Sequence, residues 1–379
     1  MFVLLTGCST ITENPQGNTI SNSHALPPIE NVEPSEPEDS SLFHEYEDEA
    51  MSTLKKMTLE EKIGQMFLVR CPTEEELDLF MSMKPGGFIL FGRDFAEKAK
   101  EEVINNIESY QNSSKIPMII GVDEEGGTVV RVSSNPLLSR ERFKSPQELY
   151  ALGGLEEIKR DAIEKSKLLL SLGINLNLSP VADVSINKAD FIYPRAFGKS
   201  AKETAEYVET VVTAMKESGI SSTLKHFPGY GSNVDTHTGS AYDTRPYDKF
   251  IKNDFLPFKS GIASGAESIL VSHNVVEAID ADLPASLSKK VIDILRSDMS
   301  FTGIIMTDDL SMGAVTELEL EHSPEVMAVI AGNDMMIVTD FEKSFNSLIE
   351  AVNSSEISID RINDSVLRIL KWKYYMNIM

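Results

Sequence analysis

Eight short apolar runs constrain the fold of this 379-residue chain more than any other feature. The runs are QMFLV (65–69), GGFILF (86–91), PMIIGVD (117–123), INLNLSPVAD (174–183), SSTLKHF (221–227), ESILVSHN (267–274), TGIIMTDD (302–309) and DMMIVTD (334–340). Runs of this length that are rich in β-branched residues are typical of buried strands. Helix-like stretches separate most of them, so the sequence predicts an α/β fold of the (β/α)₈ TIM-like barrel type.

The helix signals agree with this alternation. Thr58 and Glu61 have the spacing of a capping box that opens a short helix. Two long stretches, EEIKRDAIEKSKLLLSLG and AKETAEYVETVVTAMKESG, end in glycine, as helices with a glycine C-cap do. Residues 357–375 predict a closing helix. The alternative fold is an open doubly wound sheet, but neither GxGxxG nor GxxxxGK[ST] follows the first strand.

The first 49 residues lack the alternation. Residues 1–8 end in Leu5-Thr6-Gly7-Cys8, which resembles the lipobox of bacterial lipoproteins, although MFVLL is shorter than a full signal peptide. Residues 9–49 contain no Lys or Arg and are rich in Pro, Ser, Asn and Glu, which predicts a disordered acidic linker. We therefore expect a lipidated Cys8, a tether, and a barrel domain at 50–379 outside the cytoplasmic membrane. A chance lipobox match would instead leave a cytoplasmic protein.

Charge and cysteine content exclude some classes of protein. The net charge of −24 argues against nucleic acid as a partner, because phosphates would repel such a surface. Two cysteines cannot form a disulfide framework. No run of about 20 apolar residues occurs, so no transmembrane helix is expected. The sequence leaves the oligomeric state open.

Polar residues follow nearly every apolar run at its C-terminal end. These residues are Arg70, Arg93-Asp94, Asp123, Asp183, Lys225-His226, His273-Asn274, Asp308-Asp309 and Asp340. A single charged strand end is usually a solvated loop position. In a barrel, however, these ends share one face, where active sites lie. The repeated pattern therefore predicts a polar site at that face.

The glycine-rich stretch KHFPGYGSNVDTHTG (225–239) holds two of the six histidines. It predicts a loop after the fifth strand. Within it, Asp235 lies two residues before His237, a spacing at which a carboxylate can bond the ring, fix its tautomer and raise its proton affinity. His237 is therefore a candidate general acid–base. The alternative is an Asx-turn beside an exposed histidine.

Asp308 and Asp309 end the seventh run, and adjacent strand residues point to opposite sides. Asp308 is the better candidate for an attacking carboxylate. The alternative is that Asp309 caps the next helix and Asp308 pairs with a lysine. Asp123, Arg131 and Arg195 would together suit a ligand with hydroxyl and amide groups.

Four segments, KHFPGYG…DTH, GVDEEGG…R, SPVADV…PRAFG and ILRSDMSFTGIIMTDDLSM, resemble glycoside hydrolase family 3. The likeness is to its single-domain β-N-acetylhexosaminidases and runs from about Leu54 to the C-terminus. It implies that Asp308 is the nucleophile of a retaining reaction and that His237 is the acid–base, oriented by Asp235. It also implies that the N-acetylglucosamine contacts are made by Asp123, Arg131, Arg195, Lys225 and His226. No metal or organic cofactor is implied.

The resemblance implies an exo-β-N-acetylglucosaminidase that acts on oligosaccharides or muropeptides from peptidoglycan, with gluco against galacto preference open. The chain departs from the family pattern where Tyr230 replaces a frequent His and where Thr128 replaces a frequent Arg. The loop between Gly231 and Asp235 is also one residue shorter than the commonest version.

Three alternatives stay open at this point. One is a phosphorylase on the same scaffold, since a histidine acid–base would not repel phosphate. Another is a sugar-binding lipoprotein without activity. The third is a metal-dependent barrel hydrolase that uses His226, His237 and His273, although the first strand ends in VRCP and not in the HxH typical of such barrels.

Overall fold

The computed structural model of the chain describes residues 41–233, 235–236 and 241–379. The predictions about Cys8, about linker residues 9–40 and about His237 therefore lie outside the described residues. Among the helices of the described part, none is both long and apolar enough to cross a membrane.

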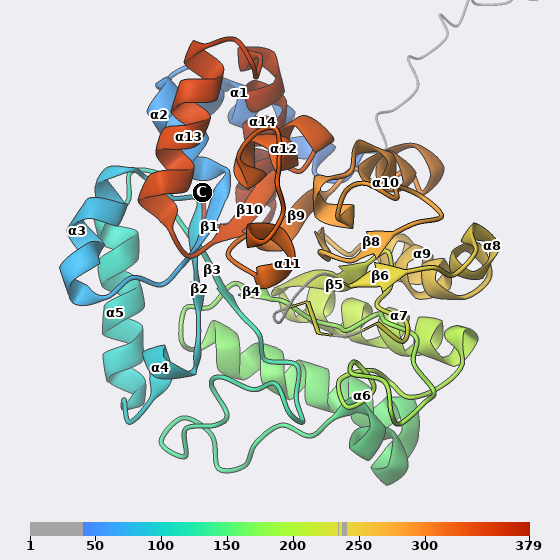
Figure 1. Cartoon of the computed structure of the whole chain (residues 1–379). Helices are drawn as coiled ribbons and strands as arrows, with labels where there is room; N and C mark the ends of the chain where they lie inside the picture. Colours follow the sequence, from blue (N-terminus) through green and yellow to red (C-terminus); the bar gives the residue numbers. More distant parts are fainter. Residues whose placement is uncertain (1–40, 234, 237–240) are drawn as a thin grey trace, which may run out of the picture. The chain divides into compact units, whose positions relative to one another are not determined.

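Eight parallel strands close into a barrel in the order β1-β10-β9-β7-β5-β4-β3-β2, with helices around it (Figure 1). The barrel strands are β1 (Phe67–Arg70), β2 (Gly87–Leu90), β3 (Ile119–Val122), β4 (Leu176–Asn177), β5 (Ser221–Phe227), β7 (Ser268–Val271), β9 (Ile304–Asp309) and β10 (Met335–Val338). Each coincides with one of the eight apolar runs, with β1 extending one residue beyond its run to Arg70, so the predicted TIM-like barrel is confirmed. Closure of the sheet contradicts the open doubly wound alternative. A short parallel pair, β6 (Tyr242–Asp243) and β8 (Val275–Val276), lies outside the barrel.

The helices follow the predicted alternation. They are α1 (Glu47–Leu54), α2 (Leu59–Gln65), α3 (Glu74–Ser82), α4 (Gly92–Phe95), α5 (Lys100–Ser113), α6 (Pro146–Leu170), α7 (Ala201–Ser218), α8 (Tyr247–Lys249), α9 (Phe255–Ala263), α10 (Lys289–Asp293), α11 (Gly313–Thr316), α12 (Pro324–Ala331), α13 (Phe341–Asn353) and α14 (Ile359–Tyr375). Shorter 3₁₀ turns are η1 (His44–Tyr46) and η3 (Ala285–Leu287), and π-helical turns are η2 (Phe250–Asp254) and η4 (Ile294–Asp298).

The predicted helix caps are present. The Thr58–Glu61 capping box opens α2. Gly219 follows α7 with φ 81°, and the amide of Ile220 donates to the carbonyl of Met215. Gly173 follows α6 with φ 89°, and the amide of Ile174 donates to the carbonyl of Leu169. Both glycines thus supply the left-handed residue of a Schellman motif, which a side chain with a Cβ disfavours.

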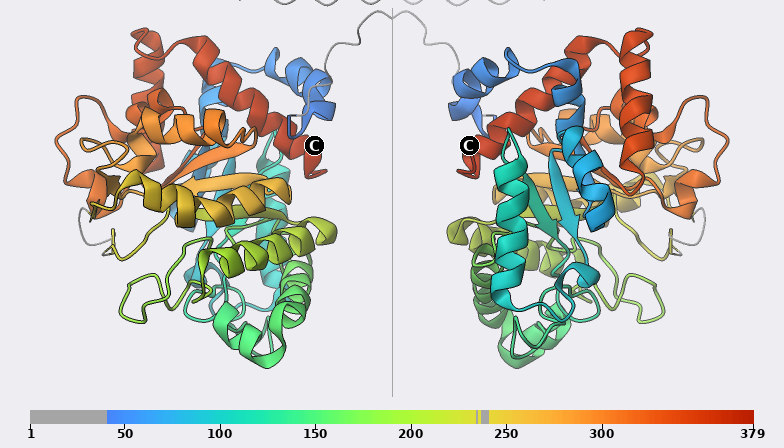
Figure 2. Two further views of the ribbon diagram at one scale, coloured as in Figure 1. Left: turned by 90° about the vertical axis from the view of Figure 1, so that its right-hand side faces the viewer. Right: turned by 90° about the vertical axis from the view of Figure 1, so that its left-hand side faces the viewer.

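The predicted domain boundary at residue 50 is wrong for residues 41–49. This segment contains η1 and the start of α1, and the compact unit with the barrel includes it. In Figure 2, α1 lies beside α14. Phe43 is buried with its ring centroid 4.9 Å from that of Tyr375, and Lys371 Nζ lies 2.7 Å from Glu47 Oε2. The acidic composition of this segment suggested disorder. The residues that hold it in place, Lys371 and Tyr375, lie at the other end of the chain, so the local sequence does not reveal them.

Helix α14 places a buried lysine at the N-terminal end of the barrel. Lys373 Nζ donates to Gln65 Oε1 at 2.6 Å, to the Gly86 carbonyl at 2.9 Å and to the Pro117 carbonyl at 2.7 Å. These acceptors lie just before β1, β2 and β3. All three are neutral, and burial lowers the pKa of Lys373 from 10.5 to about 7. Lys373 thus ties the last helix to the first three strands, on the side away from the predicted site.

We expect Lys373→Met to lower the free energy of unfolding by about 2–4 kcal/mol, because it removes the donor from several buried oxygens. The folded state binds the Lys373 proton less tightly than the unfolded chain does. The stability that this lysine contributes is therefore present above about pH 10 and is lost as the pH falls towards about 7. Urea unfolding at several pH values should show the difference between wild type and variant growing from pH 7 to pH 10. Lys289→Met, at an exposed ion pair with Asp293, is the control and should change stability by less than about 1 kcal/mol. A difference that shrinks with rising pH would contradict this account of Lys373.

Candidate active site

A cavity of about 690 Å³ lies at the C-terminal ends of the barrel strands. It is lined by seven of the eight residues that the sequence places in the catalytic and sugar-binding site: Asp123, Arg131, Arg195, Lys225, His226, Asp235 and Asp308. The eighth, His237, lies outside the described residues. The structure thus brings together residues that are up to 185 positions apart, Asp123 to Asp308, on the face where barrel enzymes hold their sites. Their individual roles stay predictions.

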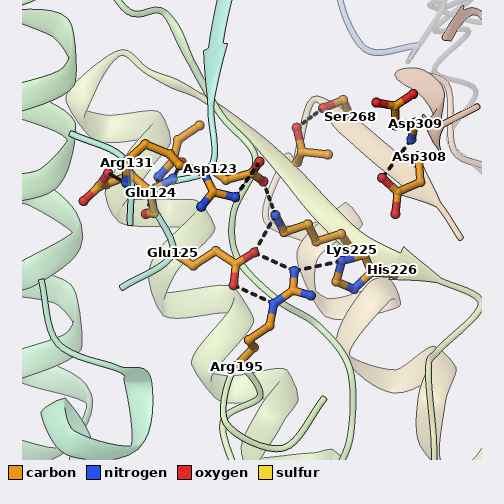
Figure 3. Close-up of polar contacts among 12 residues, drawn as sticks. Asp123, Glu124, Glu125, Arg131, Arg195, Lys225, His226, Ser268, Asp308 and Asp309 are labelled. Atoms are coloured by element: carbon orange, nitrogen blue, oxygen red, sulfur yellow. Dashed lines mark hydrogen bonds and ion pairs between the residues drawn. The ribbon is translucent and has the colours of Figure 1, made fainter. Parts of the chain in front are cut away.

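A buried network of alternating charges forms one wall of the cavity (Figure 3). Lys225 Nζ, on β5, lies 2.5 Å from Asp123 Oδ1, which follows β3, and 2.6 Å from Glu125 Oε1. Arg195 donates two hydrogen bonds to Glu125, from Nη2 to Oε1 at 2.7 Å and from Nε to Oε2 at 3.0 Å. Two cations and two carboxylates therefore balance within one connected cluster, and a bidentate pair fixes its geometry.

Glu125 is the centre of this network, and the sequence analysis did not select it. Burial alone would raise the pKa of its carboxyl, but the charges of Arg195 and Lys225 hold that pKa well below its usual range. Burial would likewise lower the pKa of Arg195, and the charge of Glu125 raises it instead. The available signal was a pair of carboxylates, Glu124-Glu125, directly after a buried strand.

The sequence analysis did not select Glu124 either, and this carboxylate has a different structural role. Its buried carboxylate accepts from the amides of Arg131 and Val132, both at 2.7 Å, and from the hydroxyl of Ser133. These bonds fix the backbone that carries Arg131, whose Nη2 lies 3.9 Å from Asp123 Oδ2. The guanidinium groups of Arg131 and Arg70 both lie over the ring of Phe91, with their Cζ atoms 5.6 and 4.9 Å from its centroid. Two contacts thus hold Arg131 at the cavity: Glu124 fixes its backbone, and the ring of Phe91 packs against its guanidinium group.

The contacts of His226 indicate one tautomer of its ring. Arg195 Nη2 lies 3.1 Å from His226 Nε2, and an arginine can only donate, so Nε2 accepts. The proton therefore sits on Nδ1, which lies 2.7 Å from Asp183 Oδ2. Pairing of β5 with β7 shifts register between Leu224 and Phe227, so strict alternation fails and both Lys225 and His226 line the cavity.

Asp183 also reaches beyond His226. Its Oδ1 accepts from the amide of Tyr230 at 2.6 Å, so one buried carboxylate fixes both the histidine and the start of the loop after β5. The sequence analysis noted Asp183 only as a polar strand end. Tyr230 in turn contacts Thr236, the neighbour of Asp235, and both Asp235 and Thr236 line the cavity.

The adjacent carboxylates on β9 have different surroundings. Asp309 Oδ1 accepts from the amide of Ser311 and Oδ2 from the hydroxyl of Thr339, both at 2.9 Å, so Asp309 stabilises the loop after β9. Asp308 Oδ1 accepts from the amide of Asp309 at 2.9 Å, and Asp308 lines the cavity. A carboxylate held at a cavity wall by its own backbone is placed to attack an electrophile bound there.

The metal-dependent alternative gains no support from the histidines in the described part. His273 Nδ1 lies 2.7 Å from Ser286 Oγ and Nε2 lies 2.9 Å from the Asp309 carbonyl. His226 likewise has both nitrogens engaged by protein groups. Across residues 41–233, 235–236 and 241–379, no three His, Cys, Asp or Glu side chains form a group that could hold a metal ion.

Known proteins share both the sequence pattern and the fold. Residues 58–372 match the family model described as the glycosyl hydrolase family 3 N-terminal domain. A beta-hexosaminidase from Nitrosomonas eutropha is 29% identical over 287 residues, which cover 73% of this chain and 79% of that protein.

Two solved structures are also similar. The first is the glycoside hydrolase family 3 beta-N-acetylglucosaminidase from Paenibacillus sp. FPU-7, with a TM-score of 0.79 and 28% identity over 85% of this chain and 63% of that chain. This chain thus spans less than two thirds of that longer enzyme. The second is the beta-N-acetylhexosaminidase from Beutenbergia cavernae, with a TM-score of 0.76 and 25% identity over 84% of this chain and 99% of that one.

Proposed function

Because this chain belongs to glycosyl hydrolase family 3, we propose that it is a retaining exo-β-N-acetylglucosaminidase. The observation that carries the proposal is the charge-balanced cluster of Asp123, Glu125, Arg195 and Lys225 at the wall of the cavity. A cluster with as many cations as carboxylates offers donors and acceptors without a net charge. That suits a neutral, hydroxyl-rich sugar better than an anionic ligand.

The proposed reaction has two steps. Asp308 attacks the anomeric carbon and forms an ester to it, while the bond to the leaving oxygen breaks and that oxygen takes a proton from His237. Water then attacks the anomeric carbon, gives its proton to His237 and releases Asp308, so the β configuration is retained. Asp235, which lines the same cavity, would orient and charge the histidine. The roles of His237 and Asp235 rest on the sequence pattern.

The test compares an aryl β-N-acetylglucosaminide with the matching β-glucoside, with and without phosphate, and follows the anomer released. We expect the N-acetyl substrate to be cleaved at least about 100-fold faster in kcat/KM, because a site built to bond an amide discriminates against a ligand that lacks it. The first product should be the β anomer of the free sugar.

The other outcomes each favour an alternative. A sugar 1-phosphate as product, formed when phosphate replaces water in the second step, would contradict hydrolysis and establish the phosphorylase. Cleavage of neither substrate would contradict both activities and leave a sugar-binding barrel.

The source of the substrate and the location of the protein are proposals from the sequence alone. We propose terminal N-acetylglucosamine residues of peptidoglycan fragments as the substrate and a lipid at Cys8 as the membrane anchor. Loss of the protein from the membrane fraction on Cys8→Ser would support the anchor, and unchanged fractionation would contradict it.

A further inference from the structure

Tyr230 joins the sugar-binding wall to the segment that carries Asp235. It is 2% exposed and lies in the loop after β5, where its own amide donates to Asp183. Its ring centroid lies 5.6 Å from those of both Phe191 and His226, the latter at an interplanar angle of 75°. The phenol ring therefore packs against His226, which the proposed function uses for the sugar, and against Phe191, which lines the cavity.

The hydroxyl of Tyr230 makes two contacts with one residue. The amide of Thr236 donates to Tyr230 Oη at 3.0 Å, and Thr236 Oγ1 lies 2.8 Å from the same oxygen. A phenol has one donor and two acceptor sites, so it can satisfy both contacts at once. One hydroxyl thus holds the backbone and the side chain of the residue that follows Asp235.

Thr236 is also fixed from the side of β9. Its carbonyl accepts from the amide of Ala314 at 3.2 Å, in helix α11 shortly after Asp308. Thr236 is 1% exposed, so these contacts are shielded from water. The segment is therefore held between the loop of the sugar-binding strand and the loop of the proposed nucleophile.

The phenol keeps its proton over the whole range in which such an enzyme would work. Burial raises the pKa of Tyr230 to about 12, and the charges of Asp308 and Asp235 act in the same direction.

We propose that Tyr230 is a positioning residue whose hydroxyl holds the Asp235–Thr236 segment in the register needed for proton transfer to the leaving group. The proposal rests on the proposed function, in which Asp235 orients the acid–base.

The first experiment is Tyr230→Phe, which removes only the hydroxyl and keeps the ring packing. The readout is kcat/KM on two substrates that differ in their need for a proton: N,N′-diacetylchitobiose and 2,4-dinitrophenyl β-N-acetylglucosaminide. We expect the value for the disaccharide to fall by about 10–100-fold, as for a misplaced catalytic group, and the value for the dinitrophenyl glycoside by less than about threefold. His237→Ala, measured in parallel, gives the limit for complete loss of the acid.

Tyr374→Phe is the matched control. Tyr374 Oη lies 3.0 Å from Thr53 Oγ1, where α14 meets α1, so this variant removes a second tyrosine–threonine hydroxyl pair outside the cavity. It should leave both kcat/KM values unchanged. Equal losses on both substrates in Tyr230→Phe, or no loss on either, would overturn the positioning role.

The single variant Thr236→Val keeps the test decisive if Tyr230→Phe folds poorly, and if both variants fold they complete a double-mutant cycle. Thr236→Val removes one of the two contacts to the hydroxyl and should show a smaller loss on the disaccharide alone. Because both residues share one contact, the losses should not add in the double variant, and full additivity would contradict the proposal. If the wild type cleaves neither substrate, the proposed function fails. If it cleaves both and the variants keep its leaving-group preference, only this inference fails.

Discussion

Asp308→Ala is expected to abolish turnover, with kcat for an aryl β-N-acetylglucosaminide falling by roughly 10⁴-fold or more. Asp308 follows the buried core of β9, lines the cavity and accepts a hydrogen bond from the amide of Asp309. The proposed function uses this half-buried carboxylate for chemistry, and its removal opens no gap in the apolar core. The melting temperature should therefore stay close to that of wild type. Initial rates and thermal unfolding of the two proteins measure both expectations.

Asp309→Asn is the matched control for this prediction. Its carboxylate bonds the amide of Ser311 and the hydroxyl of Thr339, and an asparagine can keep one acceptor of the two. We expect a loss of less than about tenfold, from disturbance of the loop that follows Asp308. If Asp309→Asn were as inactive as Asp308→Ala, or if Asp308→Ala kept more than about a hundredth of wild-type kcat, the nucleophile would be wrongly assigned.

Trapping a covalent glycosyl-enzyme would distinguish attack by Asp308 from attack by the acetamide group of the substrate itself. Some glycosidases use the acetamide of the substrate in place of a protein carboxylate. A fluorinated N-acetylglucosaminyl fluoride, which slows the second step, should add one sugar to the protein, on the peptide that contains Asp308. An unlabelled protein that still turns over substrate would favour attack by the acetamide.

The barrel could be predicted because its strands are buried on both faces. Such strands appear as short continuous apolar runs, for example GFIL at 87–90 in β2, where all four strand residues are buried. The face of the site could also be predicted, since polar residues at strand ends converge only if the strands are parallel and closed. The location of the site could therefore be predicted from the sequence, whereas the contacts between its residues could not.

The buried connections of the site could not be predicted. Glu125 is structural and central only because Arg195, 70 positions away, lies beside it, and no local pattern reports that partner. Asp183 likewise gains its role from His226 and from the amide of Tyr230. The helix at 47–54 was missed because the residues that stabilise it belong to α14, at the far end of the chain.

Glu125→Gln is the second substitution with a large expected effect on stability, because Glu125 lies at the centre of the buried ion-pair network. The amide keeps the shape of the side chain but removes a charge that Arg195 and Lys225 share. Lys225 then keeps Asp123 as its ion-pair partner, and Arg195 keeps only the charges of Asp123 and Asp183. Removal of one member of a buried ion network costs about 3–5 kcal/mol, because the remaining charge is left uncompensated. Urea unfolding at pH 7 measures this loss, and Glu217→Gln, at an exposed pair with Lys159, should change stability by less than about 1 kcal/mol.

The pH dependence gives a sharper test of Glu125. Because its pKa is held low in the folded state, its contribution is present above the carboxyl's ordinary pKa of 4.5 and is lost as the pH falls below it. The stability gap between wild type and Glu125→Gln should therefore narrow in acid. In kinetics, KM for the N-acetylglucosaminide should rise by about 10–100-fold, since Arg195 and Lys225 lose the partner that fixes them. A variant as stable as wild type at pH 7, with an unchanged KM, would mean that the cluster neither holds the fold nor shapes the sugar site.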